Sequence, residues 1–287
     1  MIPSGDRPGP TVEVSIVAFD NGAPQRRYDR LATEEPLEIR LRAGDRTQTV
    51  AITMRTPGAD FELAAGFLFN EGVLANVAAL REITYCVDPK IDAEQRYNIV
   101  NVDLHGSVLP QLDALERHFT TTSACGICGR ASLEALRDRG LERIDSELRV
   151  DPATIVALPD RLAAAQRVFA STGGLHAAAL FDARGELLAA REDVGRHNAL
   201  DKLIGWALMN GRLPLRDHVI MVSGRSSYEL VQKTVSAGVP VLCAVSAPSS
   251  LAVDLAREFG VTLIGFLRQT RFNVYAGRER IAGVAAP

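Results

Sequence analysis

The chain has 287 residues, a net charge of −3 and a hydrophobic fraction of 47%. This length and composition predict a globular protein of one large or two small domains with a full core. The slightly acidic balance gives no overall field that would attract nucleic acid or an anionic membrane. The polar start of the chain has no apolar signal segment, and no apolar run approaches the ~18 residues that cross a bilayer, so we expect a cytoplasmic protein.

The first half of the chain predicts strands and helices in mixed order. Residues 11–19 alternate like a strand, and residues 37–42 and 47–53 alternate on either side of a Gly-containing turn, which predicts a hairpin. Asp60 is placed to cap an apolar helix over residues 61–70. The remaining predicted elements of this half are a strand over 97–104 and helices over 109–118 and 131–139.

A single C-x-x-C motif, Cys125 and Cys128, lies between the last two of these helices. A zinc site usually needs two such pairs, and a disulfide framework needs a short secreted chain, so neither fits. The neighbouring Gly126 and Gly129 make the segment pliable, while Arg130 and the following helix start would lower a thiol pKa. The motif therefore favours sulfur or redox chemistry, in which a thiolate takes a terminal sulfur from a persulfide. A pair of incidental cysteines, or half of a metal site, is the alternative.

The second half predicts a more regular order of elements. Helices are predicted over 152–170, 196–209, 227–237 and 249–259, and strands over 174–181, 186–191, 218–223, 240–246 and 261–267. The final βαβαβ pattern predicts parallel strands covered by helices. The whole order resembles the cytidine-deaminase-like fold. We therefore expect an α/β protein whose C-terminal domain is a three-layer structure with a mixed sheet, beside a smaller α+β N-terminal domain.

The residues that a zinc deaminase needs are missing from the matching positions. Such an enzyme carries H-x-E at its second helix and P-C-x-x-C at its third. Here the second helix begins with His197, Asn198 and Ala199, and the third begins beyond Gly224 without a cysteine. We therefore expect neither a zinc site nor deamination.

Two polar segments follow predicted parallel strands, where open α/β sheets bind ligands. Gly224, Arg225 and Ser226 form a strand-to-helix turn whose N–H groups, hydroxyls and guanidinium could hold a phosphate, the alternative being a plain serine-capped turn. The second segment also offers arginines for phosphate and an aromatic ring for a base, the alternative being a solvated tail. Its residues are Phe266, Leu267, Arg268, Gln269, Thr270 and Arg271.

Residues 171–176, which end at His176, form a further polar segment, and another spans residues 192–198 and contains His197. Its density of Glu, Asp, Arg, His and Asn side chains is unusual for a turn. It could hydrogen-bond the edge of a purine-like ring, or it could form a buried His–Asp capping network. Cys86 and Cys243 lie in apolar runs and are expected in the core.

Several segments in the right order resemble the formate dehydrogenase accessory sulfurtransferase family (FdhD/NarQ). They include SACGICG, REDVGRHNALDKLIG, SGRSSYELVQK and GFLRQTRFNVYAG, and they cover most of the chain from residue 37 to 277. The resemblance implies a carrier that accepts sulfur from a cysteine desulfurase as a persulfide. It would deliver that sulfur to the bis-molybdopterin guanine dinucleotide cofactor of formate dehydrogenase. By position, Cys125 would carry the persulfide, Cys128 would assist, and residues 266–271 would bind the guanine nucleotide end.

The resemblance also sets expectations for domains and partners. An N-terminal α+β domain is expected over 12–120, a cysteine loop with a linking helix over 121–150, and a cofactor-binding domain over 151–277. The expected partners are the desulfurase, formate dehydrogenase and a second copy in a homodimer, without nucleic acid or membrane. Two other functions stay open: a non-catalytic molybdenum cofactor chaperone, and a thiol–disulfide oxidoreductase, although no thioredoxin-like βαβ unit precedes the cysteines.

Overall fold

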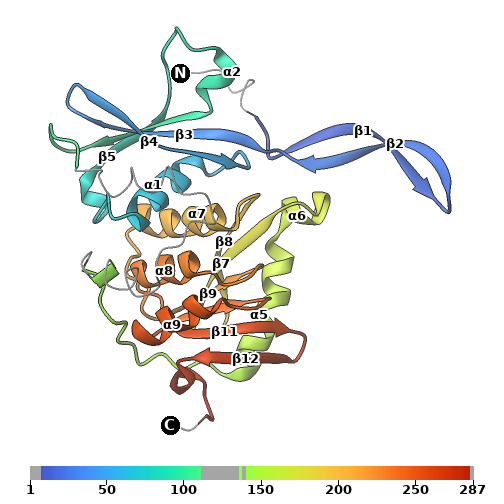
Figure 1. Ribbon diagram of the computed structural model, residues 1–287, viewed down its shortest axis with the longest axis vertical. Coiled ribbons are helices and arrows are strands. Elements are labelled where there is room, and N and C mark those ends of the chain that lie inside the picture. The colour runs from blue at the N-terminus through green and yellow to red at the C-terminus, as the bar shows by residue number, and fades with distance from the viewer. Residues whose placement is uncertain (1–7, 111–135, 138–139, 285–287) are drawn as a thin grey trace.

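The structure, a computed structural model, describes residues 8–110, 136–137 and 140–284. Within this part of the chain the strands form three sheets of two, four and six strands (Figure 1). Cys125 and Cys128 lie outside the described residues, as do most of the predicted helices over 109–118 and 131–139.

The six-stranded sheet forms the centre of the second half, in the order β12-β11-β10-β9-β7-β8. Its strands are β7 (His176–Asp182), β8 (Leu187–Asp193), β9 (His218–Val222), β10 (Val241–Ala244), β11 (Thr262–Arg268) and β12 (Arg271–Ala276). Strands β9, β10 and β11 run parallel, as the βαβαβ pattern predicts. Strand β7 is antiparallel to both of its neighbours and β12 is antiparallel to β11, so the sheet is mixed.

Helices cover both faces of this sheet (Figure 1). The helices of this half are α5 (Pro152–Ala165), α6 (Arg167–Thr172), α7 (Arg196–Met209), α8 (Tyr228–Ser236) and α9 (Ser250–Glu258). Apolar residues of α7, α8 and α9, such as Leu203, Leu230 and Leu255, share one core with the sheet. Leu158 of α5 shares a second core with the opposite face, which also holds the fully buried Cys243. The predicted three layers are therefore present, while the specific likeness to deaminases stays a prediction.

The helix predicted over 152–170 is two helices rather than one. The chain leaves helical geometry at Gln166 (φ −81°, ψ 75°), which separates α5 from α6. The carboxylate of Glu192 on β8 accepts hydrogen bonds from the backbone N–H groups of Val168 (3.0 Å) and Phe169 (2.8 Å). These N–H groups are unpaired at a helix start, so Glu192 provides the cap that allows a second helix to begin there.

The four-stranded sheet has the order β4-β3-β6-β5 and a core of its own. Its strands are β3 (Glu35–Ala43), β4 (Arg46–Arg55), β5 (Leu80–Tyr85) and β6 (Ile99–Leu104). Helix α1 (Asp60–Asn70) packs on one face of this sheet. The short helices η1 (Val77–Ala79) and α2 (Ala93–Arg96) lie in the connections between the strands. The predicted β3–β4 hairpin and helix α1 are confirmed, but the expectation that Asp60 caps the helix is wrong, because the helix begins at Asp60 and Ala59 occupies the N-cap. Strand β5 was not predicted, and the division of the chain into domains stays a prediction.

A close helix crossing joins the two larger sheets. Helices α1 and α7 meet at Gly66 and Gly205, each of which faces the backbone of the other helix. A Cβ at Gly66 would overlap the carbonyl oxygen of Asp201, and one at Gly205 would overlap that of Glu62. Only glycine allows this approach, so the crossing fixes how the four-stranded sheet sits on α7.

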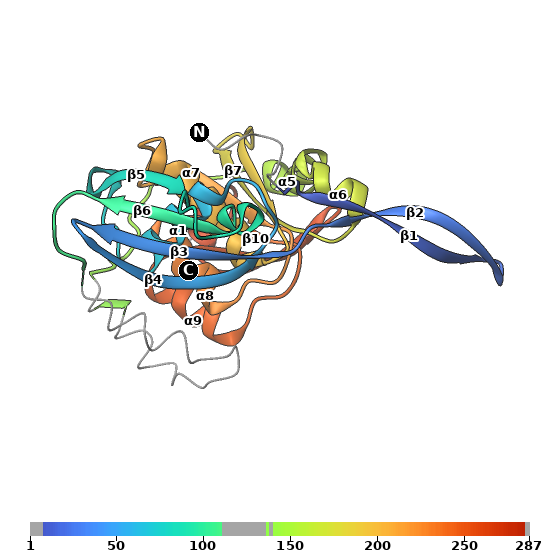
Figure 2. The ribbon, with the colours of Figure 1, turned by 90° about the horizontal axis from the view of Figure 1, so that it is seen from above.

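The third sheet is a two-stranded hairpin that projects from the rest of the molecule (Figures 1 and 2). We call it the arm: it comprises β1 (Thr11–Asp20) and β2 (Ala23–Ala32). The sequence predicts β1 but β2 was missed. The signal for β2 was Asn21-Gly22, whose positive φ angles (48° and 85°) form a tight hairpin turn.

Candidate functional site

The loops that follow β9, β10 and β11 lie side by side at the carboxyl edge of the parallel strands. The backbone N–H of Ser246 donates to the carbonyl oxygen of Gly224 (3.3 Å), and that of Phe266 donates to Ser246 (3.1 Å). The two polar segments predicted from the sequence, 224–226 and 266–271, are thus brought to one edge. This is the position at which open α/β sheets form ligand-binding crevices.

Residues 266–271 form a turn, and the chain beyond them is a strand, not the solvated tail that was the alternative to a ligand site. The chain reverses after Arg268 and returns as β12, with Arg268 opposite Arg271. Phe266 and Gln269 both hold a positive φ of 52°, a conformation that non-glycine residues rarely adopt. Such backbone strain is often found at functional sites.

The side chains of this turn point in different directions. Leu267 is fully buried in the core, so only its backbone is available to a ligand, whereas Phe266 is 39% exposed. Arg268 is exposed and its Nε donates to the carbonyl oxygen of Val245 (3.0 Å), which ties the turn to the loop after β10. Gln269, Thr270 and Arg271 are exposed.

Residues 224–226 differ in one respect from the predicted phosphate-binding turn. The N–H of Ser226 donates to Ala247 (3.3 Å), so this group is not available to a phosphate. Helix α8 begins two residues later, with Ser227 at its N-cap. The side chain of Ser226 is 1% exposed and its hydroxyl has no hydrogen-bond partner among the described residues, whereas Arg225 is exposed.

His197, in the first turn of α7, meets the start of α8. Its Nε2 lies 2.7 Å from Oε2 of Glu229 and 3.2 Å from Oγ of Ser227. The hydrogen bond with His197 lowers the pKa of Glu229, with burial acting in the opposite direction. Glu229 therefore orients the imidazole of His197 beside the start of α8.

His176 and Arg196 complete a polar cluster next to Gly224. A Cβ built on Gly224 would lie 3.5 Å from Nδ1 of His176 and 4.0 Å from Cδ of Arg196. Burial lowers the pKa of His176, the positive charges of Arg196 and His197 lower it further, and Asp193 opposes them. We call His176, Arg196, His197 and Glu229 the edge cluster. Sequence reasoning singled out the segment that ends at His176 but did not place it beside His197, and it missed Glu229.

The other polar residues of segment 192–198 are structural. Asp193 is fully buried and accepts hydrogen bonds from Thr56 N (3.1 Å) and Asn198 Nδ2 (3.1 Å), while its Oδ2 lies 2.6 Å from Nζ of Lys202. Lys202 also donates to the carbonyl oxygen of Thr56 (2.8 Å). We call Thr56, Asp193, Asn198 and Lys202 the inner network. For Asp193 and Asn198 the capping alternative therefore holds, although without a histidine.

A pocket of about 460 Å³ lies behind the edge cluster, between α5, α6 and the strand ends. Its lining is largely apolar and includes Phe169 and Gly174, with polar groups from Gln166, His176 and Ser223. Its size and mixture of groups are typical of small-molecule sites. Since Gln166 is the residue at which the predicted single helix breaks, its place in this pocket was not evident from the sequence.

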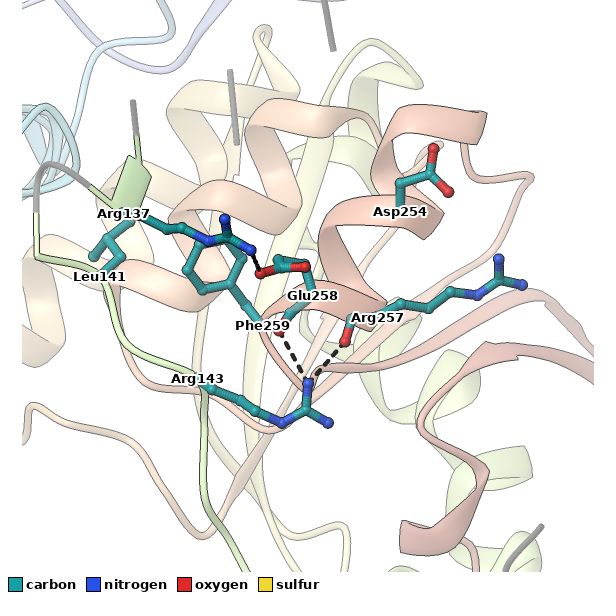
Figure 3. Close-up of a pocket in the computed structure, with 7 residues that line it drawn as sticks. All are labelled: Arg137, Leu141, Arg143, Asp254, Arg257, Glu258 and Phe259. Atoms are coloured by element: carbon teal, nitrogen blue, oxygen red, sulfur yellow. Dashed lines mark hydrogen bonds and ion pairs between the residues drawn. The ribbon is translucent and has the colours of Figure 1, made fainter. Parts of the chain in front are cut away.

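A second pocket, of about 680 Å³, lies at the C-terminal end of α9 and contains Arg137, Arg143 and Arg257 (Figure 3). Two of these arginines serve the structure. Arg143 donates to the carbonyl oxygens of Arg257 (2.9 Å) and Glu258 (3.0 Å), and Arg137 forms an ion pair with Glu258. The first interaction caps the helix end. This pocket is therefore a weaker candidate for an anion site than the carboxyl edge.

Across residues 8–110, 136–137 and 140–284, no group of three or more His, Cys, Asp or Glu side chains is arranged to hold a metal ion. No helix in the described part of the chain is both long and apolar enough to span a bilayer.

Comparisons with known proteins agree with the sequence resemblance. The sequence model of the FdhD/NarQ family matches residues 32–282. The sulfur carrier protein FdhD of Streptomyces avermitilis is 57% identical over 274 residues, covering 94% of this chain and 95% of that protein. The protein of the same name from Mycobacterium tuberculosis is 50% identical, covering 89% of this chain and 92% of its own.

A solved structure has the same fold. It is described as that of a formate dehydrogenase accessory protein from Desulfotalea psychrophila, is 26% identical, and superposes with a TM-score of 0.72 over 94% of this chain and 99% of its own. The family match spans nearly all of the described structure, including every residue of the edge cluster and of the inner network. The chain therefore belongs to the FdhD/NarQ family.

Proposed function

We propose that this protein is a cytoplasmic sulfurtransferase of formate dehydrogenase maturation. It accepts sulfur from a cysteine desulfurase as a persulfide on Cys125 and delivers it to the bis-molybdopterin guanine dinucleotide cofactor. The names of the relatives, sulfur carrier protein FdhD, support sulfur transfer. The observation that carries the cofactor half of the proposal is the meeting of loops 224–226 and 266–271 at one sheet edge.

The edge has the chemical features that a nucleotide-bearing anion requires. Arg196, Arg225 and Arg268 supply guanidinium groups, which bind phosphate oxygens in a bidentate manner. The N-terminal end of α8 adds backbone N–H groups with a favourable dipole. The exposed ring of Phe266 offers a surface for stacking on a base.

In the first chemical step, the Cys125 thiolate attacks the terminal sulfur of the persulfide on the desulfurase. A new S–S bond forms to Cys125, the S–S bond in the desulfurase breaks, and the desulfurase cysteine leaves as a thiolate. Cys128 assists from three residues further along. The terminal sulfur on Cys125 is then the cargo for the bound cofactor, and no resident metal is required for this uptake.

The first test is intact-mass measurement after incubation with a matched cysteine desulfurase and cysteine. We expect the wild-type protein to gain the mass of one sulfur, to lose it on treatment with a thiol reductant, and to gain none as Cys125→Ala. Cys243→Ala is the matched control, since its thiol is fully buried and burial raises its pKa. Uptake by Cys125→Ala equal to that of wild type would contradict the proposal.

A second test separates carrier from chaperone. The double variant Cys125→Ser with Cys128→Ser should still bind GDP, used as a probe for the nucleotide end, but should fail to activate formate dehydrogenase. If the double variant activates the dehydrogenase fully, the protein is a non-catalytic cofactor chaperone instead.

A further inference from the structure

The pocket of about 460 Å³ between α5, α6 and the strand ends, which we call the α6 pocket, has an uncharged wall. Among the described residues that line it there is no Asp, Glu, Lys or Arg. Leu162, Met221 and Val245 give it apolar walls, and Phe169, which is 42% exposed, adds an aromatic ring. Such a lining suits an uncharged, flat ligand rather than a phosphate group, because a charge in an apolar pocket loses its hydration without compensation.

One polar side chain of this pocket has no partner within the described protein. Gln166 is 7% exposed, and its carboxamide makes no hydrogen bond with any described residue. The residue stands at the break between α5 and α6, and its side chain lines the pocket. Buried polar groups are nearly always paired, so a carboxamide that is nine-tenths buried, unpaired and next to a cavity points to a ligand.

Two further groups add hydrogen-bonding capacity to the α6 pocket. Oγ of Ser223 accepts a hydrogen bond from the N–H of Ala177 (2.9 Å), which leaves its hydroxyl proton to donate. His176 also lines the pocket, and burial lowers its pKa, with the charges of Arg196 and His197 acting in the same direction. Its imidazole is therefore neutral at pH 7 and offers one N–H donor and one lone pair. The pocket thus presents donors and acceptors without a net charge.

The α6 pocket and the exposed ring of Phe266 lie at different strands of one sheet edge. Phe266 is near the carboxyl end of β11, whereas His176 begins β7, and β10 and β9 lie between these two strands. Three strand spacings, about 14 Å, therefore separate them. Arg225 and the start of α8 follow β9, so cationic groups lie between the two ring sites. This order matches a ligand whose two ring systems are joined through phosphates.

We propose that the α6 pocket binds a pterin ring, while the guanine ring of the same ligand stacks at Phe266. This inference rests on the proposed function, because the dinucleotide cofactor that receives the sulfur carries both ring systems. The pyrimidinone edge of a pterin has an N–H next to a carbonyl group, and the carboxamide of Gln166 can pair with both at once. Gln166 is thus the residue that sets the specificity of the pocket. Guanine presents the same edge, so the test follows the two rings separately.

The test uses the full chain and two probes: 6-hydroxymethylpterin, followed by its fluorescence, and GDP, followed by calorimetry. The wild-type protein should bind the pterin, and saturating GDP should not displace it, since the two rings occupy different sites. Gln166→Met keeps the length of the side chain but removes both hydrogen-bonding groups. It should weaken pterin binding by about tenfold or more and leave GDP affinity unchanged. Absence of pterin binding to the wild type, or displacement of the pterin by GDP, would overturn the proposal.

Thermal unfolding separates a binding role of Gln166 from a structural one. Because its carboxamide has no partner in the described part of the chain, Gln166→Met should unfold at the wild-type temperature or above it. Gln48→Met, in β4 of the four-stranded sheet, is the matched control and should change neither stability nor binding. If Gln166→Met unfolds at a lower temperature and binds the pterin as wild type does, the residue serves the fold and the proposal is wrong. If pterin binding is absent while sulfur uptake and GDP binding are intact, only the assignment of the α6 pocket fails.

Discussion

The edge cluster and the inner network arise from the same short segment, residues 192–198, yet they differ in how fully their polar groups are paired. In the inner network, Asp193 and Lys202 are 0% and 2% exposed, and both are held by several polar partners. In the edge cluster, the side chains of His197 and Glu229 are 33% and 54% exposed, and Nε of Arg196 has no partner among the described residues. A completed polar network holds a fold together, whereas an incomplete one at a sheet edge is available to a ligand.

The largest loss of stability should come from a change at the helix crossing that supports both the edge cluster and the inner network. In Gly205→Ala the added methyl group overlaps the backbone of Glu62, which cannot move aside as a side chain could. We expect α1 and α7 to separate and the free energy of unfolding to fall by roughly 4 kcal/mol or more. Thermal unfolding followed by circular dichroism measures this change.

The control for this prediction is Gly174→Ala. Its Cβ would meet the methyl group of Ala32 at 3.5 Å and two oxygens of Thr172 at 3.9 Å, all ordinary van der Waals distances. A loss of stability equal to that of Gly205→Ala would show that the close crossing is not the cause.

The second-largest loss of stability should come from breaking the inner network. Asp193→Asn keeps the shape of the side chain but leaves the ammonium of the buried Lys202 without its counter-charge. Removing one partner of a buried ion pair costs about 3–5 kcal/mol. Chemical denaturation should show this loss, while GDP binding measured under native conditions should change little, because Asp193 is fully buried and out of reach of a ligand.

Lys202→Met tests the same pair from the other side. Without the cation, Asp193 is left as the buried charge, so a similar loss is expected. Unchanged stability in both variants would mean that the pair is not part of the framework.

The comparison also explains which parts of the site could be predicted from the sequence. The meeting of residues 224–226 with 266–271 follows from parallel strands, whose carboxyl ends share one edge, and the sequence pattern was sufficient for it. Within segment 192–198, the sequence could not separate the residues of the edge cluster from those of the inner network, because both groups are equally polar. Their separation depends on the turn between β4 and α1, which lies more than 130 residues away along the chain and supplies Thr56 to the inner network.

Long-range packing accounts for the other features that the sequence did not place. His176 joins the edge cluster because β7 runs antiparallel to β9, so the start of one strand meets the end of the other. The break at Gln166 depends on a cap from Glu192 in β8. Strand β2 is different: its arginine-rich sequence has little strand propensity, and it is held by regular pairing across the Asn21-Gly22 turn.

A third prediction concerns ligand affinity rather than stability. Arg268→Ala removes an exposed guanidinium between two loops of the edge. GDP should bind about tenfold more weakly, since a hydrogen bond to a charged group contributes roughly 1.5–3 kcal/mol. Stability should stay within about 0.5 kcal/mol of wild type, as is usual for surface substitutions. Isothermal titration calorimetry measures the affinity.

The matched control is Arg184→Ala, which removes an arginine that is 84% exposed in the turn after β7, at the opposite end of the sheet. It should bind GDP as wild type does. Equal weakening in both variants would indicate a general charge effect instead of a site at the edge.

The smallest predicted effect is the dependence of stability and of GDP affinity on pH, which arises from His176. Burial, together with the positive charges of Arg196 and His197, lowers the pKa of His176 below its unfolded value of 6.5. Between the folded and the unfolded pKa values, His176 therefore binds a proton in the unfolded chain but not in the folded chain. The stabilising contribution of the neutral imidazole is complete above pH 6.5 and is lost as the pH falls below that value toward the folded pKa.

An anion at the edge has the opposite preference, because it favours a protonated His176. GDP affinity should therefore rise as the pH is lowered toward 6, and this rise should shrink in His176→Asn. His218 provides the control. Burial also lowers its pKa, but it begins β9 at the opposite edge of the sheet. His218→Asn should thus alter how stability depends on pH and leave the pH dependence of binding intact; if both variants change binding alike, His176 does not face the ligand.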